Sequence, residues 1–334
     1  MSEVTDLFDR PVRDLRISVT DRCNFRCTYC MPKEIFGPGH EFLPRDQLLT
    51  FEELVSVTRA FVDRGVNKVR ITGGEPLLRK GLDELIAMLS RIEGVDDLTM
   101  TTNASLLARK ADELVTAGLN RVTVSLDAMD DPTFQAMNDV GFPVHTVLDA
   151  IEVASDAGLG PIKINCVVKR GVNEHAVVDM ADHFKGSGHI VRFIEYMDVG
   201  NTNGWRLDDV VSADEMIERL NEVHPLEPLP ANYPGEVANR FRYLDGSGEV
   251  GIIASVTKPF CGSCTRARVS AEGNLFTCLF ASFGTSLRDA IRSGENVGEV
   301  IDEVWAKRDD RYSEVRSAQT PRIGTPVEMS YIGG

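Results

Sequence analysis

The chain has 334 residues, of which 43% are hydrophobic and 26% charged, and its formal net charge is −15. These values are those of a globular protein with one large domain or two ordinary ones, and no run of about 18 apolar residues offers a membrane span. The negative charge argues against a general attraction to nucleic acid polymers or anionic membranes, so any anionic ligand must find a local basic pocket.

The N-terminal stretch MSEVTDLFDRPVRDL is acidic and is interrupted by Pro11. It therefore lacks the basic start and the apolar stretch of a secretory signal, and we expect a cytoplasmic protein. Thiols stay reduced in that compartment. The seven cysteines consequently indicate metal ligands, catalytic residues or core residues rather than disulfides.

From residue 12 to about residue 222, short β-branched runs alternate with longer amphipathic runs, which is typical of βα units. Helices are expected between the strands, for example at 51–65 and 111–118, each ending at a glycine. Six units predict an open partial barrel or a doubly wound sheet, and both place the site at the C-terminal ends of the strands. The expected strands are DLRISVT (14–20), NKVRIT (67–72), DLTMTT (97–102), RVTVSL (121–126), PIKINCVV (161–168) and IVRFIEY (190–196).

A linker-like stretch, HPLEPLPANYPGE at 224–236, carries four prolines among thirteen residues and divides the chain into expected domains at 1–223 and 224–334. The second domain is expected to contain a short β meander formed by RFRYL, VGIIASV and RARVSA. One or two helices should follow, around TSLRDAIRSG and VGEVIDEVWAKR.

Six of the seven cysteines fall into two groups of three. The N-terminal trio, Cys23, Cys27 and Cys30, follows the first strand, where such a fold carries out its chemistry. The C-terminal trio, Cys261, Cys264 and Cys278, has the spacing C-x2-C-x13-C. Two sites with four cysteines each would need eight. If Cys166, which lies in the apolar run INCVV, is a core residue, both sites lack a fourth cysteine and are open.

Thiolates suit zinc or iron–sulfur clusters, and His40 could complete a zinc site with the N-terminal trio. The spacing C-x3-C-x2-C with the aromatic Tyr29 between the last two cysteines resembles the radical S-adenosylmethionine (SAM) superfamily instead. That resemblance implies a [4Fe–4S] cluster on three thiolates, whose fourth iron chelates SAM. One electron from the cluster would cleave SAM to a 5′-deoxyadenosyl radical that abstracts hydrogen from the substrate.

The segment ITGGEPLL at 71–78 supports the resemblance. Glycine lets backbone groups approach a ligand closely, and a glutamate can accept hydrogen bonds from an ammonium group. The superfamily holds the methionine moiety of SAM with such a segment. The SAM-binding residues implied in this sequence are Tyr29, Gly74, Glu75, Ser125 and Met197.

The C-terminal trio, followed by CLF and with TRAR after Cys264, resembles the GTP 3′,8-cyclase family, whose members start molybdenum cofactor (molybdopterin) biosynthesis. The resemblance extends from LRISVTDRCNFRCTYCMP through VKRGVNE to the terminal YIGG. It implies an α/β fold: a partial, open (β/α)6 barrel similar to a TIM barrel, with a smaller C-terminal α+β domain that carries a second [4Fe–4S] cluster.

Arg266 and Arg268 are two residues apart in an expected strand, so their side chains leave the same face and suit phosphate oxygens. The resemblance adds further positions that would contact GTP. The implied substrate-binding residues are Arg16, Arg70, Thr101, Lys163, Arg266, Ala267 and Arg268.

In the implied reaction, the second cluster binds the guanine edge of GTP, hydrogen is taken from ribose C3′, and the carbon radical attacks C8. No residue is assigned as a catalytic acid or base. The implied partners are a flavodoxin-like or similar electron donor, a downstream cyclic pyranopterin monophosphate synthase and a second copy of the chain in a homodimer. The family's double-glycine end would bring Gly333 and Gly334 into the active site.

Two departures from the family pattern stand out. Ala104 follows TTN where the family often has glycine, so a positive φ there would strain the alanine. The segment MNDVGFP at 137–143 differs from a more basic family segment. The alternatives are another radical SAM enzyme with an auxiliary cluster, such as a peptide-modifying maturase, or a non-catalytic iron–sulfur or zinc protein.

Overall fold

The computed structural model describes residues 3–316 and 325–333 of the chain. Six parallel strands, adjacent in chain order, form the middle of one sheet. A doubly wound sheet would reverse its strand order at a switch point, so this sequential order identifies the partial barrel. The strands are β1 (Asp14–Ser18), β2 (Lys68–Thr72), β3 (Asp97–Thr102), β4 (Arg121–Ser125), β5 (Lys163–Val168) and β6 (Ile190–Glu195).

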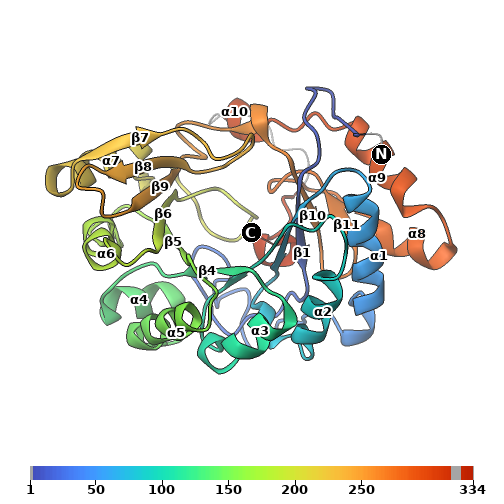
Figure 1. The fold of residues 1–334 in the computed structure, drawn as a ribbon, viewed down its shortest axis with the longest axis horizontal. Coiled ribbons are helices and arrows are strands. Elements are labelled where there is room, and N and C mark those ends of the chain that lie inside the picture. The colour runs from blue at the N-terminus through green and yellow to red at the C-terminus, as the bar shows by residue number, and fades with distance from the viewer. Residues whose placement is uncertain (1–2, 317–324, 334) are drawn as a thin grey trace.

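Helices connect these strands and lie around the outside of the sheet (Figure 1). Gly118 in the left-handed region ends α3, as the sequence predicts, whereas α1 begins at a capping box of Thr50 and Glu53 and ends at Val62, before the expected Gly65. The helices are α1 (Phe51–Val62), α2 (Leu82–Leu89), α3 (Ala111–Ala117), α4 (Asp131–Asn138), α5 (Val144–Asp156), α6 (Ala176–Phe184) and α7 (Ala213–Val223).

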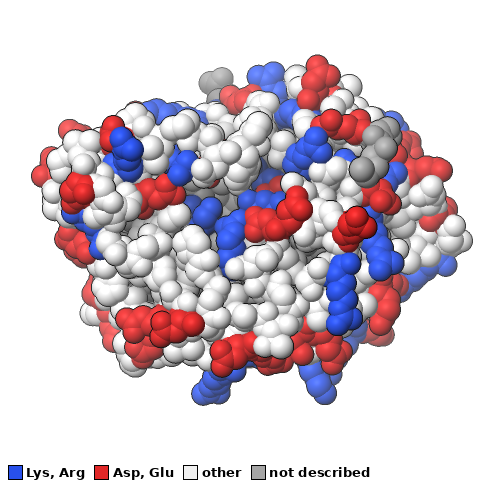
Figure 2. All heavy atoms as spheres, viewed as in Figure 1, with Lys and Arg blue, Asp and Glu red and all other residues white. Residues whose placement is uncertain are grey.

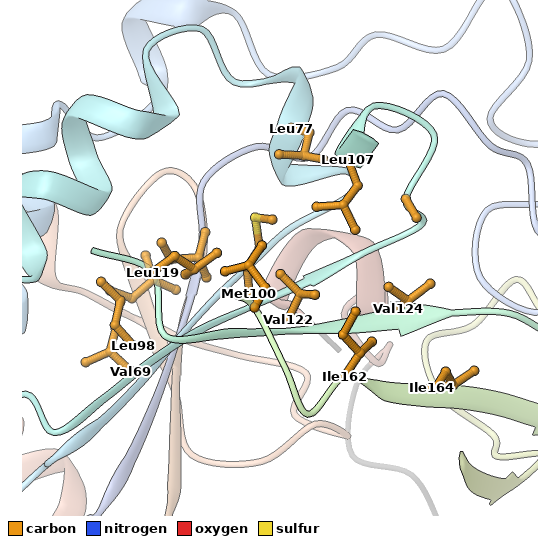
Figure 3. Packing of buried hydrophobic residues seen from close by; sticks show 14 of the residues in the cluster. Val69, Leu77, Leu98, Met100, Leu107, Leu119, Val122, Val124, Ile162 and Ile164 are labelled. Atoms are coloured by element: carbon orange, nitrogen blue, oxygen red, sulfur yellow. The ribbon is translucent and has the colours of Figure 1, made fainter. Parts of the chain in front are cut away.

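The two faces of the sheet have opposite character. In β3, Leu98 and Met100 are buried among the apolar residues that contact the helices, as Figure 3 shows. Thr99 and Thr101 alternate with them and therefore point to the inner face. Polar side chains thus line the interior of the barrel, while the main core lies between sheet and helices. Cys166 is fully buried in that core, as predicted.

The C-terminal region supplies strands to both edges of this sheet, in the order β12-β11-β10-β1-β2-β3-β4-β5-β6-β9-β8-β7. RFRYL and VGIIASV pair antiparallel as β8 and β9, as expected, but the third expected strand of the meander is wrong: β9 pairs with β6, whereas β10 pairs with β1 at the opposite edge. The strands of this region are β7 (Leu226–Leu229), β8 (Asn239–Tyr243), β9 (Glu249–Ile253), β10 (Arg266–Val269), β11 (Asn274–Phe276) and β12 (Thr285–Ser286).

The expected C-terminal helices are α8 (Leu287–Ser293) and α9 (Val297–Ala306), and two short helices follow, α10 (Tyr312–Val315) and α11 (Met329–Ile332). The contact between α1 and α9 fastens this region to the barrel. Among the described residues, no helix has both the length and the apolar character that crossing a membrane requires.

Candidate active site

Both cysteine trios line one cavity inside the barrel. Its wall comes from the C-terminal ends of the barrel strands, from the loop that follows β1, and from the C-terminal region. The lining includes Cys23, Cys27, Cys30, Cys261, Cys264 and Cys278. The cysteines therefore lie where the sequence predicts chemistry.

The N-terminal trio lies in a loop that the barrel holds from several sides. Arg26 donates hydrogen bonds to the carbonyl oxygens of Cys23 at 2.8 Å and Phe36 at 2.7 Å. Burial raises the pKa of the Cys23 thiol to about 11 and raises the pKa of Cys27 and Cys30 as well. These thiols would ionise when a cationic metal group supplies compensating charge.

The segment 137–143 braces this loop from outside. The carbonyl oxygens of Asn138 and Met137 accept hydrogen bonds from the backbone N–H groups of Arg26 and Thr28, at 3.0 and 3.1 Å. Phe142 also contacts Phe25, with ring centroids 5.1 Å apart. The segment that departs from the family pattern therefore supports the N-terminal trio in this chain.

The zinc alternative for the N-terminal trio finds no support in the position of His40. The ring of His40 lies between those of Phe36 and Phe42, with centroids 4.7 Å from each. Among the described residues that line the cavity, His40 does not occur.

Cys264 of the C-terminal trio lies beside two arginines. Arg266 Nη2 and Arg308 Nη2 donate to its Sγ at 3.1 and 3.2 Å. Burial alone would raise the pKa of Cys264, but the two guanidinium charges outweigh it and lower the pKa to about 7. Burial raises the pKa of Cys278 to about 12. One thiol of this trio is thus prepared to act as a thiolate.

Four of the five predicted SAM-binding residues line the cavity: Tyr29, Gly74, Ser125 and Met197. Glu75 lies outside the described lining. Its carboxylate accepts hydrogen bonds from the Leu77 N–H at 3.0 Å, the Thr102 hydroxyl at 2.8 Å and the Asn103 N–H at 2.8 Å. Burial raises the pKa of Glu75 to about 7. Glu75 therefore ties the loop after β2 to the end of β3.

The glycines before Glu75 are required by a close backbone approach. A Cβ on Gly73 would collide with the Thr20 carbonyl oxygen, and one on Gly74 with the carbonyl group of Arg22. The Gly74 and Glu75 N–H groups donate to those same carbonyl oxygens, each at 2.8 Å. The glycine pair thus seats the loop after β2 against the chain that leads into Cys23.

Basic side chains occupy the inner wall on the C-terminal trio's side. Arg70 Nη1 donates to the hydroxyls of Thr101 and Thr123 at 3.1 and 3.0 Å. In the face shown in Figure 2, Lys and Arg side chains gather at a central hollow. Of the predicted substrate-binding residues, those that line the cavity are Arg16, Arg70, Thr101, Arg266 and Arg268.

Lys163 and Ala267 lie outside the described lining. Ala267 is fully buried on the opposite side of β10 from its two arginine neighbours, as strand alternation requires. Lys163 lies at the start of β5. Burial and then the charge of Arg192 lower the pKa of Lys163 to about 7.

Three residues that line the cavity were not predicted from the sequence: Arg192, Asn165 and Arg308. Arg192 Nε donates to Asn165 Oδ1 at 3.0 Å, which joins neighbouring strands at the inner wall. Burial and the charge of Arg70 lower the pKa of Arg192 to about 9. The available signal was a charged residue inside the apolar strand IVRFIEY, at an inward position.

The C-terminal end of the described chain reaches this site. Arg268 Nη1 donates to the Gly333 carbonyl oxygen, and Gly333 has a φ of 77°. A Cβ on Gly333 would collide with the Thr72 side chain. Gly334 lies outside the described residues. Ala104 has a φ of 61°, so the expected left-handed conformation and its strain are present.

The residues present fit two iron–sulfur clusters. Each trio offers three cysteines at the wall of a cavity, which leaves one coordination position of a [4Fe–4S] cluster for a small molecule. The described side chains include no group of three or more His, Cys, Asp or Glu that could hold a metal ion. The fit therefore rests on the donor chemistry and on the shared cavity.

Comparison with known proteins relates the chain to two family models. Residues 17–184 match the Radical SAM superfamily, and residues 189–314 match Molybdenum Cofactor Synthesis C. The two matches meet near the start of β6, and the expected boundary at 223/224 stays a prediction.

Curated relatives match over nearly the whole chain. The GTP 3′,8-cyclase of Acidothermus cellulolyticus is 53% identical and covers 99% of both chains. The GTP 3′,8-cyclase of Xanthomonas axonopodis pv. citri is 52% identical over 98% of both, and that of Staphylococcus haemolyticus is 46% identical over 100% of both. Among solved structures, Streptococcus suis SuiB bound to S-adenosylmethionine has a TM-score of 0.64 and 15% identity, covering 94% of this chain and 70% of that chain. This last likeness concerns the fold alone.

Proposed function

The chain belongs to the GTP 3′,8-cyclase family within the radical SAM superfamily, and we propose that it converts GTP to (8S)-3′,8-cyclo-7,8-dihydroguanosine 5′-triphosphate. This is the first step of molybdenum cofactor biosynthesis. The observation that carries the proposal is that two incomplete cysteine sites open onto one cavity whose wall also holds arginines. The C-terminal trio accounts for a second cluster, and the arginines account for a substrate with several negative charges.

The N-terminal trio is proposed to hold one [4Fe–4S] cluster, with SAM against Tyr29, Gly74, Ser125 and Met197. Their common lining of the cavity supports this assignment. Glu75 is proposed to contact SAM as well as to hold the loop, because a carboxylate has about four acceptor sites and protein donors use three of them. When bound, the cluster and SAM supply one-electron cleavage of SAM to a radical that abstracts hydrogen.

The C-terminal trio is proposed to hold the second [4Fe–4S] cluster and to face the guanine edge of GTP. The triphosphate then meets the guanidinium groups of the inner wall. Buried arginines without a carboxylate partner are poorly solvated, and phosphate oxygens would satisfy several of their N–H donors. The proposed contacts are Arg16, Arg70, Thr101, Lys163, Arg192, Arg266, Ala267 and Arg268.

Orientation is the chain's main contribution to the reaction. Ribose C3′ must face the radical source and C8 must lie within bonding distance, so both ends of GTP have to be held. No residue of the site is assigned as the proton donor of the last step.

The proposed partners are a flavodoxin-like or similar electron donor, a downstream cyclic pyranopterin monophosphate synthase and a second copy of the chain. We propose the cytoplasm as the location. The reducing conditions there keep cysteine thiols free of disulfides, which cluster assembly on six cysteines requires.

The test is anaerobic reconstitution with iron and sulfide, followed by incubation with SAM, GTP and a reductant, and identification of the nucleotide product. We expect 5′-deoxyadenosine and the 3′,8-cyclised nucleotide, and no cyclised product with ATP. A C261A/C264A/C278A variant should still cleave SAM but should not cyclise GTP. A wild-type protein that holds both clusters and leaves GTP unchanged would refute the proposal.

A further inference from the structure

A buried ion-pair cluster lies next to the C-terminal trio, and only its Arg308 also lines the described cavity. It consists of Asp6, Arg10 and Arg308, of whose side chains at most 2% is exposed. Asp6 Oδ2 accepts hydrogen bonds from Arg10 Nε at 2.6 Å and from Arg308 Nη1 at 3.0 Å. Asp6 Oδ1 accepts from the backbone N–H groups of Phe8 and Arg10. One carboxylate therefore closes the turn at residues 6–10 and joins two arginines.

Both arginines also bind the C-terminal trio. Arg10 Nη1 donates to the Cys261 carbonyl oxygen at 2.6 Å. Arg308 Nη1 donates to the Cys264 carbonyl oxygen at 2.8 Å, and its Nη2 donates to Cys264 Sγ at 3.2 Å. The backbone of two cysteines and one sulfur are thus held by a single buried cluster.

Trp305 of α9 fixes the two arginines relative to each other. Its Nε1 donates to the Arg10 carbonyl oxygen at 2.9 Å, and its ring centroid lies 4.6 Å from the Arg308 guanidinium carbon. Trp305 is fully buried. The N-terminal segment at residues 6–10 and the C-terminal end of α9 therefore meet at the C-terminal trio.

The charges at this place favour an anion at the sulfur. Arg10, Arg266 and Arg308 are buried; among the described residues, Asp6 pairs with Arg10 and Arg308, Asp310 pairs with Arg308, and the charge of Asp14 acts on Arg266. A buried cation without a matching anion is costly, and a thiolate at Cys264, which accepts from two of the arginines, would compensate it.

We propose that Asp6, Arg10 and Arg308 are positioning residues of the C-terminal cluster: they fix Cys261 and Cys264 for assembly, and Arg308 raises the reduction potential of that cluster. N–H donors to a ligand sulfur stabilise the more negative, reduced state, which is the physical reason for the direction. The inference rests on the proposed C-terminal cluster. The N-terminal cluster should be unaffected.

The experiment measures each cluster in a variant that lacks the cysteines of the other cluster. In a C23A/C27A/C30A background, iron and sulfide after anaerobic reconstitution and an EPR-monitored redox titration report the C-terminal cluster. Arg308→Gln should lower its iron content at least about twofold or shift its midpoint potential to a more negative value, because it removes a positive charge and a donor to the sulfur. Asp6→Asn removes the carboxylate that holds both arginines, so it should lower the iron content at least about twofold. Arg308→Lys keeps the positive charge but loses the two-pronged guanidinium donor. Its iron content and midpoint potential should therefore lie between those of wild type and Arg308→Gln.

The matched control is Arg64→Gln, which breaks the 2.6 Å ion pair between Arg64, in the turn after α1, and Asp302 of α9 and touches none of the cysteines. This control should change neither the iron content nor the midpoint potential of the C-terminal cluster. In the reciprocal C261A/C264A/C278A background, Asp6→Asn and Arg308→Gln should leave the remaining cluster intact.

Unchanged iron content and potential in Asp6→Asn and Arg308→Gln would overturn the inference. Equal losses in both backgrounds, or loss of cooperative unfolding, would also overturn it, because the ion-pair cluster would then support the fold in general. If the C23A/C27A/C30A parent itself binds no iron, the proposal of a second cluster is refuted. That result differs from failure of the positioning role alone, in which the parent binds iron and the further substitutions have no effect.

Discussion

Several arginine side chains inside the barrel are buried and therefore poorly hydrated, and this burial lowers their pKa values. Burial, followed by neighbouring positive charges, lowers the pKa of Arg16, of Arg192 to about 9 and of Arg268 to about 10. A triphosphate would restore hydrogen-bond acceptors and negative charge to these groups. The same burial and crowding bring the pKa of Lys163 to about 7, so its charge changes near neutral pH.

GTP affinity is therefore predicted to depend on pH through Lys163. Bound triphosphate favours the ammonium form and raises the pKa of Lys163, so binding takes up a proton. Affinity is full below the pKa of the free protein, about 7, and falls as pH rises toward the pKa in the complex, by at most about tenfold per pH unit. Dissociation constants measured by calorimetry at several pH values between about 6 and about 9 check this.

Lys163→Arg is the control, because arginine keeps the charge and does not titrate in this range. It should bind GTP with a flatter pH profile, whereas Lys163→Gln should bind weakly at every pH. Identical profiles for wild type and Lys163→Arg would contradict a role for Lys163 protonation.

Short elements, rather than long helices, position the site. The turn Pro76–Leu78 follows the glycine pair that seats the loop after β2 against the N-terminal trio's loop. At the other end of the chain, α11 places Ser330 at the cavity and is followed by Gly333, whose carbonyl oxygen meets Arg268. Glycine at 333 suits this place because its φ is positive and a Cβ has no room.

Gly333→Ala is predicted to reduce GTP cyclisation while both clusters remain. A Cβ would collide with Thr72 and move the carbonyl group that faces Arg268, and a small misplacement of this kind can reduce turnover about 100-fold. Product formation and iron content are the measurements. Adding Gly334→Ala should deepen the loss.

Gly294→Ala provides the matched control. Gly294 ends α8 with a φ of 80°, but no atom lies within 4 Å of the Cβ position. This variant should lose about 1 kcal/mol of folding free energy and keep its activity. If Gly333→Ala cyclises GTP at the wild-type rate, the C-terminal glycine has no role in the reaction.

At the scale of the whole molecule, the C-terminal region completes the barrel sheet instead of forming a separate one. β10 covers the β1 edge and β9 covers the β6 edge, each as a parallel neighbour. Exposed edges of a parallel sheet invite pairing with other chains. The region that brings the second cysteine trio therefore also protects both edges of the barrel.

A fragment of residues 1–223 is consequently predicted to aggregate or to unfold without cooperativity. It would expose the edges of β1 and β6 and would lose the contact of α1 with α9. Size-exclusion chromatography and thermal unfolding beside the full chain are the measurements. A monomeric fragment that unfolds cooperatively would instead establish residues 1–223 as an independent domain.

The sequence by itself determined the local features. Alternating apolar residues placed all six barrel strands, because one face had to meet the helices, and cysteine spacing identified two incomplete thiolate sites. Only the tertiary structure decided which sheet edges the C-terminal strands join, because pairing partners distant in sequence leave no local pattern. For the same reason it alone revealed Arg192 at the cavity wall, Glu75 as a brace between the loop after β2 and the end of β3, and the contact of Arg10 with Cys261, 251 residues further along the chain.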